Sequence, residues 1–413
     1  MNTSKFTISI LREARADEKR TPFTPDQVKI LIANFPNIKI LVQPSKKRCF
    51  KDEEYSKAGA KLDEDIINSN IIFGIKEVDI SKIIEGKTYL FFSHTSKVPN
   101  GNVQNSQDQS IIYKKNLLRK VLKKNVTLID YENIRDKSKK AYRYLGFGRF
   151  AGIVGCYNTL NLYLKLNKKK LLPRAFEINS YEKIKKLITK QNFNKLKILQ
   201  TGGGNVAKGS MEILKHANIK QISLKDYLDK KYDEPVYCNI SIREHIERKD
   251  GKDFSHQDFI LNPQEYKSKV KNYLFDTDIL ITGHYWDPKF PKLFYQDQIN
   301  EFKNLKIIGD ITCDINGAIP TTIRSTTIAK PYYSVDINSM EEIDLGNKGI
   351  AVMAVDNLPS ELPNEASEEF GKNIISEVLP YLFKKDDGRI SRATTTSQGK
   401  FTSSFSYLKD FIK

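Results

Sequence analysis

The sequence predicts an α/β protein, because short apolar runs alternate with helical stretches along most of its 413 residues. The apolar runs have the composition of buried strands, and several end directly in ionisable residues. Helical periodicity fills the intervals between them. A glycine-rich turn at residues 202–204 joins one apolar run to a helix, which is typical of parallel sheets that bind nucleotides.

The N-terminal part of the chain contains enough of these elements for one α/β unit. Thr24 followed by Pro25 marks a helix start, since threonine caps helices and proline suits their first turn. The predicted strands are 5–11, 38–42, 71–75, 88–92 and 126–129, and the other predicted helices are 52–60, 64–69 and 111–123. The polar, glycine-containing stretch Asn100–Ser110 is expected to be a mobile loop.

The C-terminal part repeats the pattern around the glycine turn. Strands are predicted at 275–283, 305–309 and 349–355, and a helix at 364–382. Glycines at 148, 152 and 155 indicate close packing of a segment that becomes helical at 157–166. The polar segment 226–258 allows no assignment, and no internal repeat occurs.

The glycine turn has the pattern G-x-G-x-x-A, from Gly202 through Gly204 to Ala207. Glycine allows a tight turn and a close approach of the backbone to a pyrophosphate, which the helix N–H groups then bind. The alternative is a strand–helix turn without a ligand. The flanking strand and helix favour a dinucleotide site, whose predicted residues are Gly202, Gly203, Gly204, Asn205, Val206 and Ala207.

The chain is strongly basic, with 68 Lys and Arg residues against 50 Asp and Glu residues and a net charge of +18. The lysines are scattered, so we interpret the surplus as a solvated surface with some attraction for anionic substrates. An RNA-binding or nucleotide-sensing protein is the non-enzymatic alternative, but it requires a basic patch with interleaved aromatic residues, and no such cluster occurs. We therefore expect no nucleic-acid partner.

The cysteines and the N-terminus indicate a cytoplasmic protein. Cys49, Cys156, Cys238 and Cys313 lie far apart without the spacing of a metal site, which fits a reducing compartment and no bound metal. No apolar signal segment or membrane-spanning run is present, so we expect no membrane partner. The oligomeric state is left open.

Several motifs in the same order resemble the lysine-forming saccharopine dehydrogenases of the alanine dehydrogenase and transhydrogenase superfamily. The motif Asn205-Val-Ala-Lys-Gly209 is most similar to the lysine–2-oxoglutarate reductase domain. The motifs that carry the resemblance are Arg20-Thr-Pro-Phe-Thr-Pro25, Gly74-Ile-Lys-Glu77, Phe92-Ser-His-Thr-Ser-Lys97, Ala141–Gly155, Thr201–Gly209, Gly283-His-Tyr-Trp-Asp287, Asp310–Asp314 and Val355-Asp-Asn-Leu-Pro359.

The resemblance implies two Rossmann-like domains with parallel sheets flanking a central cleft, the first domain being discontinuous. Its substrate domain would comprise residues 1–149 and 336–413, and its dinucleotide-binding domain residues 150–335. The implied activity in amino-acid metabolism is the NAD(P)-dependent interconversion of saccharopine with L-lysine and 2-oxoglutarate. Another amino-acid dehydrogenase of the superfamily, such as an alanine dehydrogenase, is the alternative.

The resemblance also assigns roles to polar residues. Lys76 and His94 follow two apolar strands, at the sheet edge where ligands bind in α/β proteins, and they match the acid–base pair of the family. Their alternatives are an exposed lysine paired with Glu77 and a core or capping histidine. The remaining matches are Arg20 for a substrate carboxylate, Arg15 and Lys97 for further cationic substrate contacts, and Asp314 near the nicotinamide.

The nicotinamide cofactor, NADP(H) or NAD(H), is not fixed by these matches. NAD-preferring domains carry an acid about 20 residues past the glycine turn. Lys220–Lys225 contains none, and Ser223 and Lys225 could accept a 2′-phosphate, which favours NADPH. The adjacent Asp226 leaves NADH open. The spacing does not show which of Asp310 and Asp314 faces the cofactor. His284 and Trp286 suit packing as well as contact with a ligand.

Overall fold

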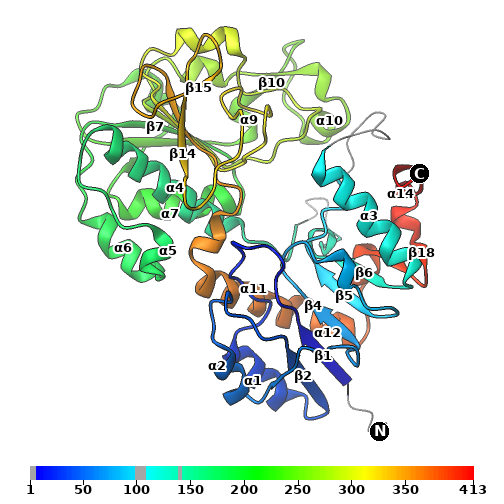
Figure 1. Cartoon of the computed structure of the whole chain (residues 1–413). Coiled ribbons are helices and arrows are strands. Elements are labelled where there is room, and N and C mark those ends of the chain that lie inside the picture. The colour runs from blue at the N-terminus through cyan, green and yellow to red at the C-terminus, as the bar shows by residue number, and fades with distance from the viewer. Residues whose placement is uncertain (1–5, 98–107, 138–141) are drawn as a thin grey trace. The chain divides into compact units, whose positions relative to one another are not determined.

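The computed structural model describes residues 6–97, 108–137 and 142–413, which form two compact units (Figure 1). The first unit comprises Met1–Gly146 and Pro363–Lys413, and the second comprises Phe147–Leu362. The first domain is therefore discontinuous, as predicted. Most of the loop expected at Asn100–Ser110 lies outside the described residues.

The first unit is built on an eight-stranded sheet of order β18-β17-β6-β5-β4-β1-β2-β3. The six strands from β3 to β6 in this order are mutually parallel, and β17 joins β6 in the antiparallel direction. The strands are β1 (Phe6–Ile10), β2 (Ile38–Val42), β3 (Lys61–Leu62), β4 (Ile71–Phe73), β5 (Thr88–Phe91), β6 (Thr127–Asp130), β17 (Thr394–Ser397) and β18 (Lys400–Phe401).

The helices of the first unit come from both ends of the chain: α1 (Pro25–Asn34), α2 (Asp52–Lys57), α3 (Gln109–Lys123), α11 (Pro363–Glu377), α12 (Leu379–Phe383), α13 (Arg389–Ala393) and α14 (Leu408–Phe411). The Thr24 hydroxyl accepts a hydrogen bond from the Gln27 N–H and caps α1 as predicted. The helix predicted at 64–69 is wrong. Turns occur there instead, with the carboxylates of Asp63 and Asp65 accepting nearby backbone N–H bonds.

The second unit contains another eight-stranded sheet, of order β15-β14-β16-β13-β12-β7-β9-β8. All strands from β16 to β8 in this order are parallel, whereas β14 and β15 are antiparallel to their neighbours. The strands are β7 (Lys197–Thr201), β8 (Lys220–Gln221), β9 (Val236–Ile240), β12 (Ile279–Thr282), β13 (Ile307–Asp310), β14 (Tyr332–Val335), β15 (Glu342–Ile343) and β16 (Ile350–Met353), with a separate hairpin of β10 (Ile246–Arg248) and β11 (Tyr266–Ser268).

One domain boundary needs correction. Residues 336–362 were assigned to the first domain, but β16 hydrogen-bonds to β13 and so belongs to the second sheet. The segment 226–258, which showed no clear pattern, contains β9 and β10 together with short helices. Its strand β9 lies directly beside β7 and pairs with it in parallel.

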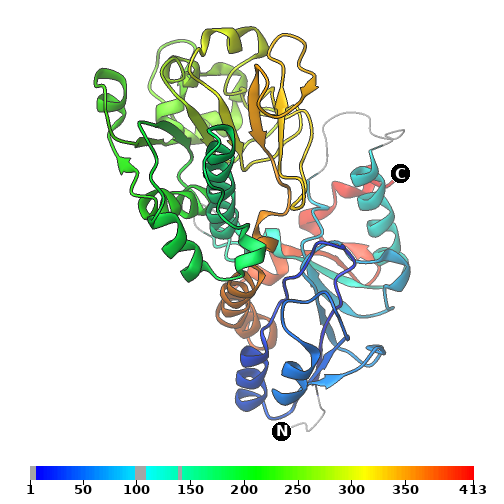
Figure 2. The same ribbon diagram turned by 60° about the vertical axis from the view of Figure 1, so that its left-hand side comes forward.

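The longest helix, α4 (Gly148–Leu166), lies against α7 (Asn205–His216) (Figure 2). A Cβ atom on Gly152 would lie 1.9 Å from the Val206 carbonyl oxygen, and one on Gly209 would lie 1.9 Å from the Arg149 carbonyl oxygen. The predicted close packing at Gly152 is therefore confirmed. The other helices of this unit are α5 (Ala175–Ile178), α6 (Tyr181–Thr189), α8 (Leu224–Asp229), α9 (Ile242–His245) and α10 (His256–Leu261).

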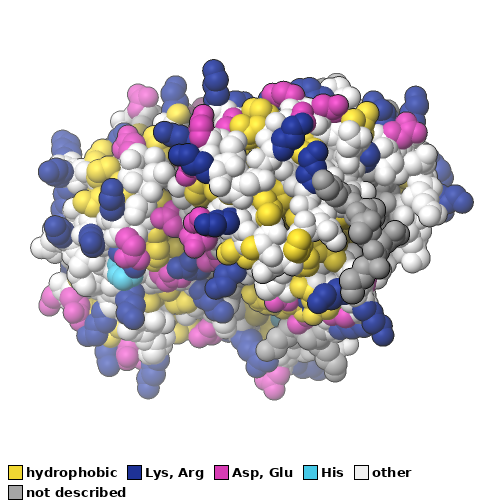
Figure 3. Space-filling view, turned by 90° about the horizontal axis from the view of Figure 1, so that it is seen from below, with side chains coloured by type: hydrophobic (Ala, Val, Ile, Leu, Met, Phe, Trp, Pro, Cys, Tyr) yellow, Lys and Arg dark blue, Asp and Glu magenta, His cyan; other side chains and the backbone are white. Residues whose placement is uncertain are grey.

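Charged side chains of both signs are mixed on the face of the molecule in Figure 3, where Lys and Arg form no single patch. This distribution agrees with the scattered lysines of the sequence. Within the described residues, no helix is long and apolar enough to cross a membrane.

Candidate functional site

The glycine turn lies at the carboxyl end of β7, and its three glycines differ in what the fold requires of them. Gly202 has a φ of +114°, and a Cβ atom there would lie 2.5 Å from the Gly283 carbonyl oxygen. Only glycine fits both conditions. A Cβ atom on Gly203 or Gly204, in contrast, would meet nothing within 4 Å, and neither has a positive φ. The protein's own packing therefore gives no reason for glycine at these two positions.

The helix that follows this turn is open at its N-terminus. Gly204 is the N-cap of α7 and provides no side-chain hydrogen bond to the first turn. The first N–H groups of a helix have no partner within the helix, and they carry its positive dipole end. The N–H groups of Asn205, Val206 and Ala207 are thus in the arrangement that binds phosphate groups.

Two histidines lie beside the turn, the buried His245 and the partly buried His284. The His284 Nδ1 atom is 2.8 Å from the Thr201 hydroxyl, and the rings of His284 and His245 are 5.5 Å apart. Burial lowers the pKa of His284 to about 4. Burial, with the His284 ring adding to it, lowers the pKa of His245 to about 3. Both rings are therefore neutral at physiological pH.

The structure separates the two aspartates that follow β13. Asp310 is buried, and its carboxylate accepts hydrogen bonds from the hydroxyls of Thr282 at 2.6 Å and Thr322 at 2.5 Å. It therefore organises the carboxyl ends of β12 and β13. Asp314 is exposed in the loop beyond. Of the two, only Asp314 has a side chain that a ligand can reach at the surface.

Ser223 and Lys225 do not lie where the cofactor prediction required. That prediction took the strand after α7 to be the neighbour of β7, but β9 lies between β7 and β8. Both residues are exposed and follow β8, the edge strand, in or next to α8. They are one strand further from the glycine turn than chain order predicts.

In the first unit, Lys76 lies in the turn after β4, and Glu13 from the loop after β1 supports that turn. The Glu13 carboxyl group accepts hydrogen bonds from the N–H groups of Ile75 at 2.6 Å and Lys76 at 2.9 Å. Burial, with the charge of Glu18 adding to it, raises the pKa of Glu13 to about 8. Burial also lowers the pKa of Lys76. Glu77 opposes this shift, and Arg20 acts in the same direction as burial.

His94 follows β5 and is surrounded by carboxylates. Its Nδ1 atom is 3.1 Å from Glu132 and its Nε2 atom 3.9 Å from Glu77. Its φ of +53° is unusual for a residue with a side chain, and such strain of order 1 kcal/mol concentrates at functional sites. Since Glu77 follows Lys76 directly, the structure places the ends of β4 and β5 around one group of charges.

Glu132 is the centre of this group, with only 4% of its side chain exposed. It is 3.2 Å from the Lys97 ammonium and 3.3 Å from the Arg143 guanidinium, as well as next to His94. Burial favours a higher pKa for Glu132, but His94, Lys97 and Arg143 outweigh burial and lower it well below its usual range. Glu132 is therefore an anion that binds three potential cations.

Arg20 is buried and bonded within the protein. Its Nε atom donates to Glu18 at 2.7 Å, and 2% of its side chain is exposed. Burial favours a higher pKa for Glu18, but the charge and hydrogen bonds of Arg20 outweigh it and lower the pKa. Arg15, in the same loop, is partly exposed and pairs with Asp17. The expected carboxylate anchor Arg20 thus already binds a carboxylate of its own chain.

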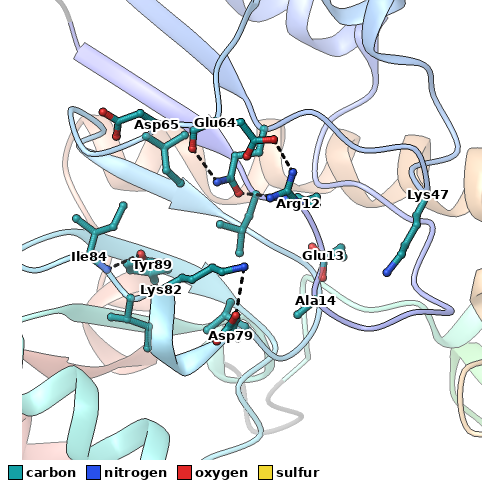
Figure 4. A pocket seen from close by; sticks show the side chains of 15 residues that line it. Arg12, Glu13, Ala14, Lys47, Glu64, Asp65, Asp79, Lys82, Ile84 and Tyr89 are labelled. Atoms are coloured by element: carbon teal, nitrogen blue, oxygen red, sulfur yellow. Dashed lines mark hydrogen bonds and ion pairs between the residues drawn. The ribbon is translucent and has the colours of Figure 1, made fainter.

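Glu13 also lines a cavity of about 550 Å³ (Figure 4). Its lining carries both charges, including Arg12 bonded to Glu64 at 2.7 Å and Lys82 paired with Asp79 at 3.4 Å. None of the residues predicted for the site is among the described residues that line it. His94 lies between Glu77 and Glu132, and Lys76 directly precedes Glu77, so we take the ends of β4, β5 and β6 as the candidate active site of this unit.

The sequence analysis missed three carboxylates of this region: Glu13, Glu18 and Glu132. Glu13 and Glu132 lie just after strand ends that the sequence did identify, and Glu18 lies further along the loop that contains Glu13, so their positions could have been noted. Their contacts could not all be predicted, because some join segments far apart in the chain, such as Glu132 and His94.

Comparison with known proteins assigns the chain to a family. The sequence profile of the alanine dehydrogenase/PNT N-terminal domain matches residues 9–153, and that of the corresponding C-terminal domain matches residues 238–403. The chain belongs to this family of oxidoreductases. Within the solved structures, an L-alanine dehydrogenase shares its fold, with a TM-score of 0.61, 13% identity and coverage of 99% of this chain and 100% of that one. A transhydrogenase from Sinorhizobium meliloti does so with a TM-score of 0.56, 14% identity and coverage of 96% and 98%.

Curated relatives are more similar in sequence. The alpha-aminoadipic semialdehyde synthase of Arabidopsis thaliana is 30% identical over 95% of this chain and 40% of its own length. The mitochondrial enzyme of that name from Mus musculus is 28% identical over 98% and 48%. The chain thus spans less than half of these two proteins. A saccharopine dehydrogenase [NAD(+), L-lysine-forming] of Emericella nidulans is 24% identical over 89% of this chain and 90% of its own.

Proposed function

We propose that the chain is an NAD(P)-dependent oxidoreductase that interconverts saccharopine with L-lysine and 2-oxoglutarate. The second unit would bind the dinucleotide, and the first unit the substrates. The observation that carries the cofactor proposal is the pair Gly203 and Gly204, which face open space beside the uncapped start of α7. A pyrophosphate bound there would account for glycine where packing does not. The relatives named for saccharopine or aminoadipic semialdehyde support the substrate proposal.

The nicotinamide, when bound, supplies or accepts the hydride. The chain's own residues then have to move protons at a secondary amine and at the water that adds to the imine. Burial lowers the pKa of Lys76 and so favours its uncharged form, which is the form that accepts a proton. His94 carries an imidazole, the side chain best suited to exchange protons near neutral pH. Glu132 holds the His94 ring in place from one side while remaining ionised.

The test is a comparison of substrates followed by the absorbance of the reduced nicotinamide. L-lysine with 2-oxoglutarate should consume NADPH or NADH and yield saccharopine, identified by mass spectrometry. Alanine and ornithine, and pyruvate in place of 2-oxoglutarate, serve as competing substrates. Turnover with alanine and pyruvate but none with lysine would contradict the proposal and favour another amino-acid dehydrogenase of the superfamily.

The cofactor half of the proposal has its own test. Gly203→Val fills the open space above the turn without meeting a protein atom at Cβ. It should therefore keep the melting temperature of the wild type while weakening dinucleotide binding at least tenfold, as followed by nicotinamide fluorescence. Unchanged binding in this variant would mean that the phosphates do not lie on the turn.

A further inference from the structure

The strand order of the second sheet bears on which residues meet the adenosine end of the dinucleotide. This inference rests on the proposed function. In dinucleotide-binding sheets, the pyrophosphate lies on the glycine turn after the first strand. The ribose of the adenosine reaches the end of the strand beside it, on the side away from the nicotinamide. The strand order therefore decides where the 2′ position of that ribose lies.

The neighbour of β7 on this side is β9. Residues Lys197–Thr201 pair in parallel with Val236–Ile240, so the two strands end at the same level. The contact continues beyond the strands, because the Gly202 N–H donates to the Ile240 carbonyl oxygen at 2.9 Å. The Asn239 side chain in turn donates to the Gly202 carbonyl oxygen at 3.1 Å. The residues directly after Ile240 thus lie alongside the glycine turn.

These residues are Ser241, Ile242 and Arg243. Arg243 is exposed, and none of the described residues forms a hydrogen bond or an ion pair with its guanidinium group. The nearest carboxylate in the sequence, Glu244, accepts a hydrogen bond from the Ser241 N–H at 2.6 Å. Recognition of the ribose 2′-hydroxyl of NADH requires a carboxylate as acceptor. The Glu244 carboxylate is already engaged by the backbone.

We propose that Arg243, together with the Ser241 hydroxyl, binds the 2′-phosphate of NADPH and makes the enzyme prefer this cofactor. A guanidinium group forms paired, charge-assisted hydrogen bonds with a phosphate. The same group offers little to the neutral 2′-hydroxyl of NADH. Lys225, which has the same charge and is also exposed, follows the edge strand β8 and is separated from β7 by β9.

The test measures binding of 2′,5′-ADP and 5′-ADP by isothermal titration calorimetry to the wild-type chain, Arg243→Ala and Lys225→Ala. The wild type should bind 2′,5′-ADP more tightly. Arg243→Ala should lose about 10- to 100-fold of affinity for 2′,5′-ADP, the usual effect of removing a charged hydrogen-bond donor, and keep its affinity for 5′-ADP. Lys225→Ala should match the wild type with both ligands.

The outcomes separate this inference from the proposed function. A phosphate preference that persists in Arg243→Ala, or that disappears in Lys225→Ala, would overturn the assignment while leaving dinucleotide binding intact. A wild type that binds NADH and NADPH equally well would also overturn it. A wild type that binds no adenine nucleotide would remove the proposed function itself.

Discussion

The crossing of α4 and α7 makes a quantitative prediction for Gly152→Ala. The new methyl group would lie 1.9 Å from the Val206 carbonyl oxygen and 2.7 Å from the Ser210 nitrogen, whereas ordinary contact begins at 3.4 Å. Both neighbours are helix backbone, so no side-chain rotation relieves the overlap and the helices must separate by about 1.5 Å. Overpacking of this kind costs about 3 kcal/mol, the upper end of the common range. Alanine regains about 1 kcal/mol through its higher helix propensity.

The net loss of about 2 kcal/mol should lower the melting temperature by about 4–8 °C for a unit of this size. Scanning calorimetry of Gly152→Ala and Gly203→Ala makes the comparison, because the methyl group of the second variant meets nothing within 4 Å. We expect Gly203→Ala to melt with the wild type. A Gly152→Ala variant that does so as well would refute the claim that glycine is needed at this crossing.

Three further predictions concern ionisable groups. Lys76→Met and His94→Gln should each lower kcat by about 10²- to 10⁴-fold while leaving dinucleotide affinity unchanged. The double variant should be little worse than the poorer single variant. Normal turnover in either single variant would exclude an acid–base role for the replaced residue. Glu132→Gln should lower the free energy of unfolding in urea by about 1–2 kcal/mol, less than for a fully buried pair because its partners are partly exposed. An unchanged urea midpoint would show that the charge is dispensable. His245 and His284 are neutral in the folded protein, but in the unfolded chain they take up protons below about pH 6.5. The free energy of unfolding should therefore decrease as the pH is lowered, by up to about 1.4 kcal/mol per pH unit for each histidine. The melting temperature should decrease less steeply between about pH 7 and pH 5 when both histidines are replaced by glutamine.

Local sequence patterns were sufficient for the sheet class and for the strand ends that carry polar residues. The apolar runs at 71–75 and 88–92 stand out because parallel strands are buried on both faces. Lys76 and His94 could be named for the same reason, since a residue just past such a run lies at the sheet edge. The glycine turn likewise depends only on neighbouring residues.

The order of the strands could not be predicted in this way. Chain order placed Lys220–Lys225 next to the glycine turn, but this segment forms a strand of two residues at the sheet edge. The longer and more apolar segment Val236–Ile240 pairs with β7 along five residues instead. Burial of that segment favours the central position, and this preference concerns the whole sheet rather than any local motif.

The roles of Arg20 and of the cationic residues near His94 follow from how their charges are paired. A motif identifies Arg20 as an anchor, but its buried bonds to Glu18 leave this pair nearly neutral. The two members of the pair act on the pKa of Lys76 in opposite directions, since Arg20 lowers it and Glu18 raises it. Around Glu132 the balance is different, because one carboxylate faces the half-exposed Lys97 and Arg143 as well as His94. Under the proposed function, the positive charge that attracts a dicarboxylate substrate would therefore come from Lys97 and Arg143, in the segments after β5 and β6, rather than from the arginine that the motif marks.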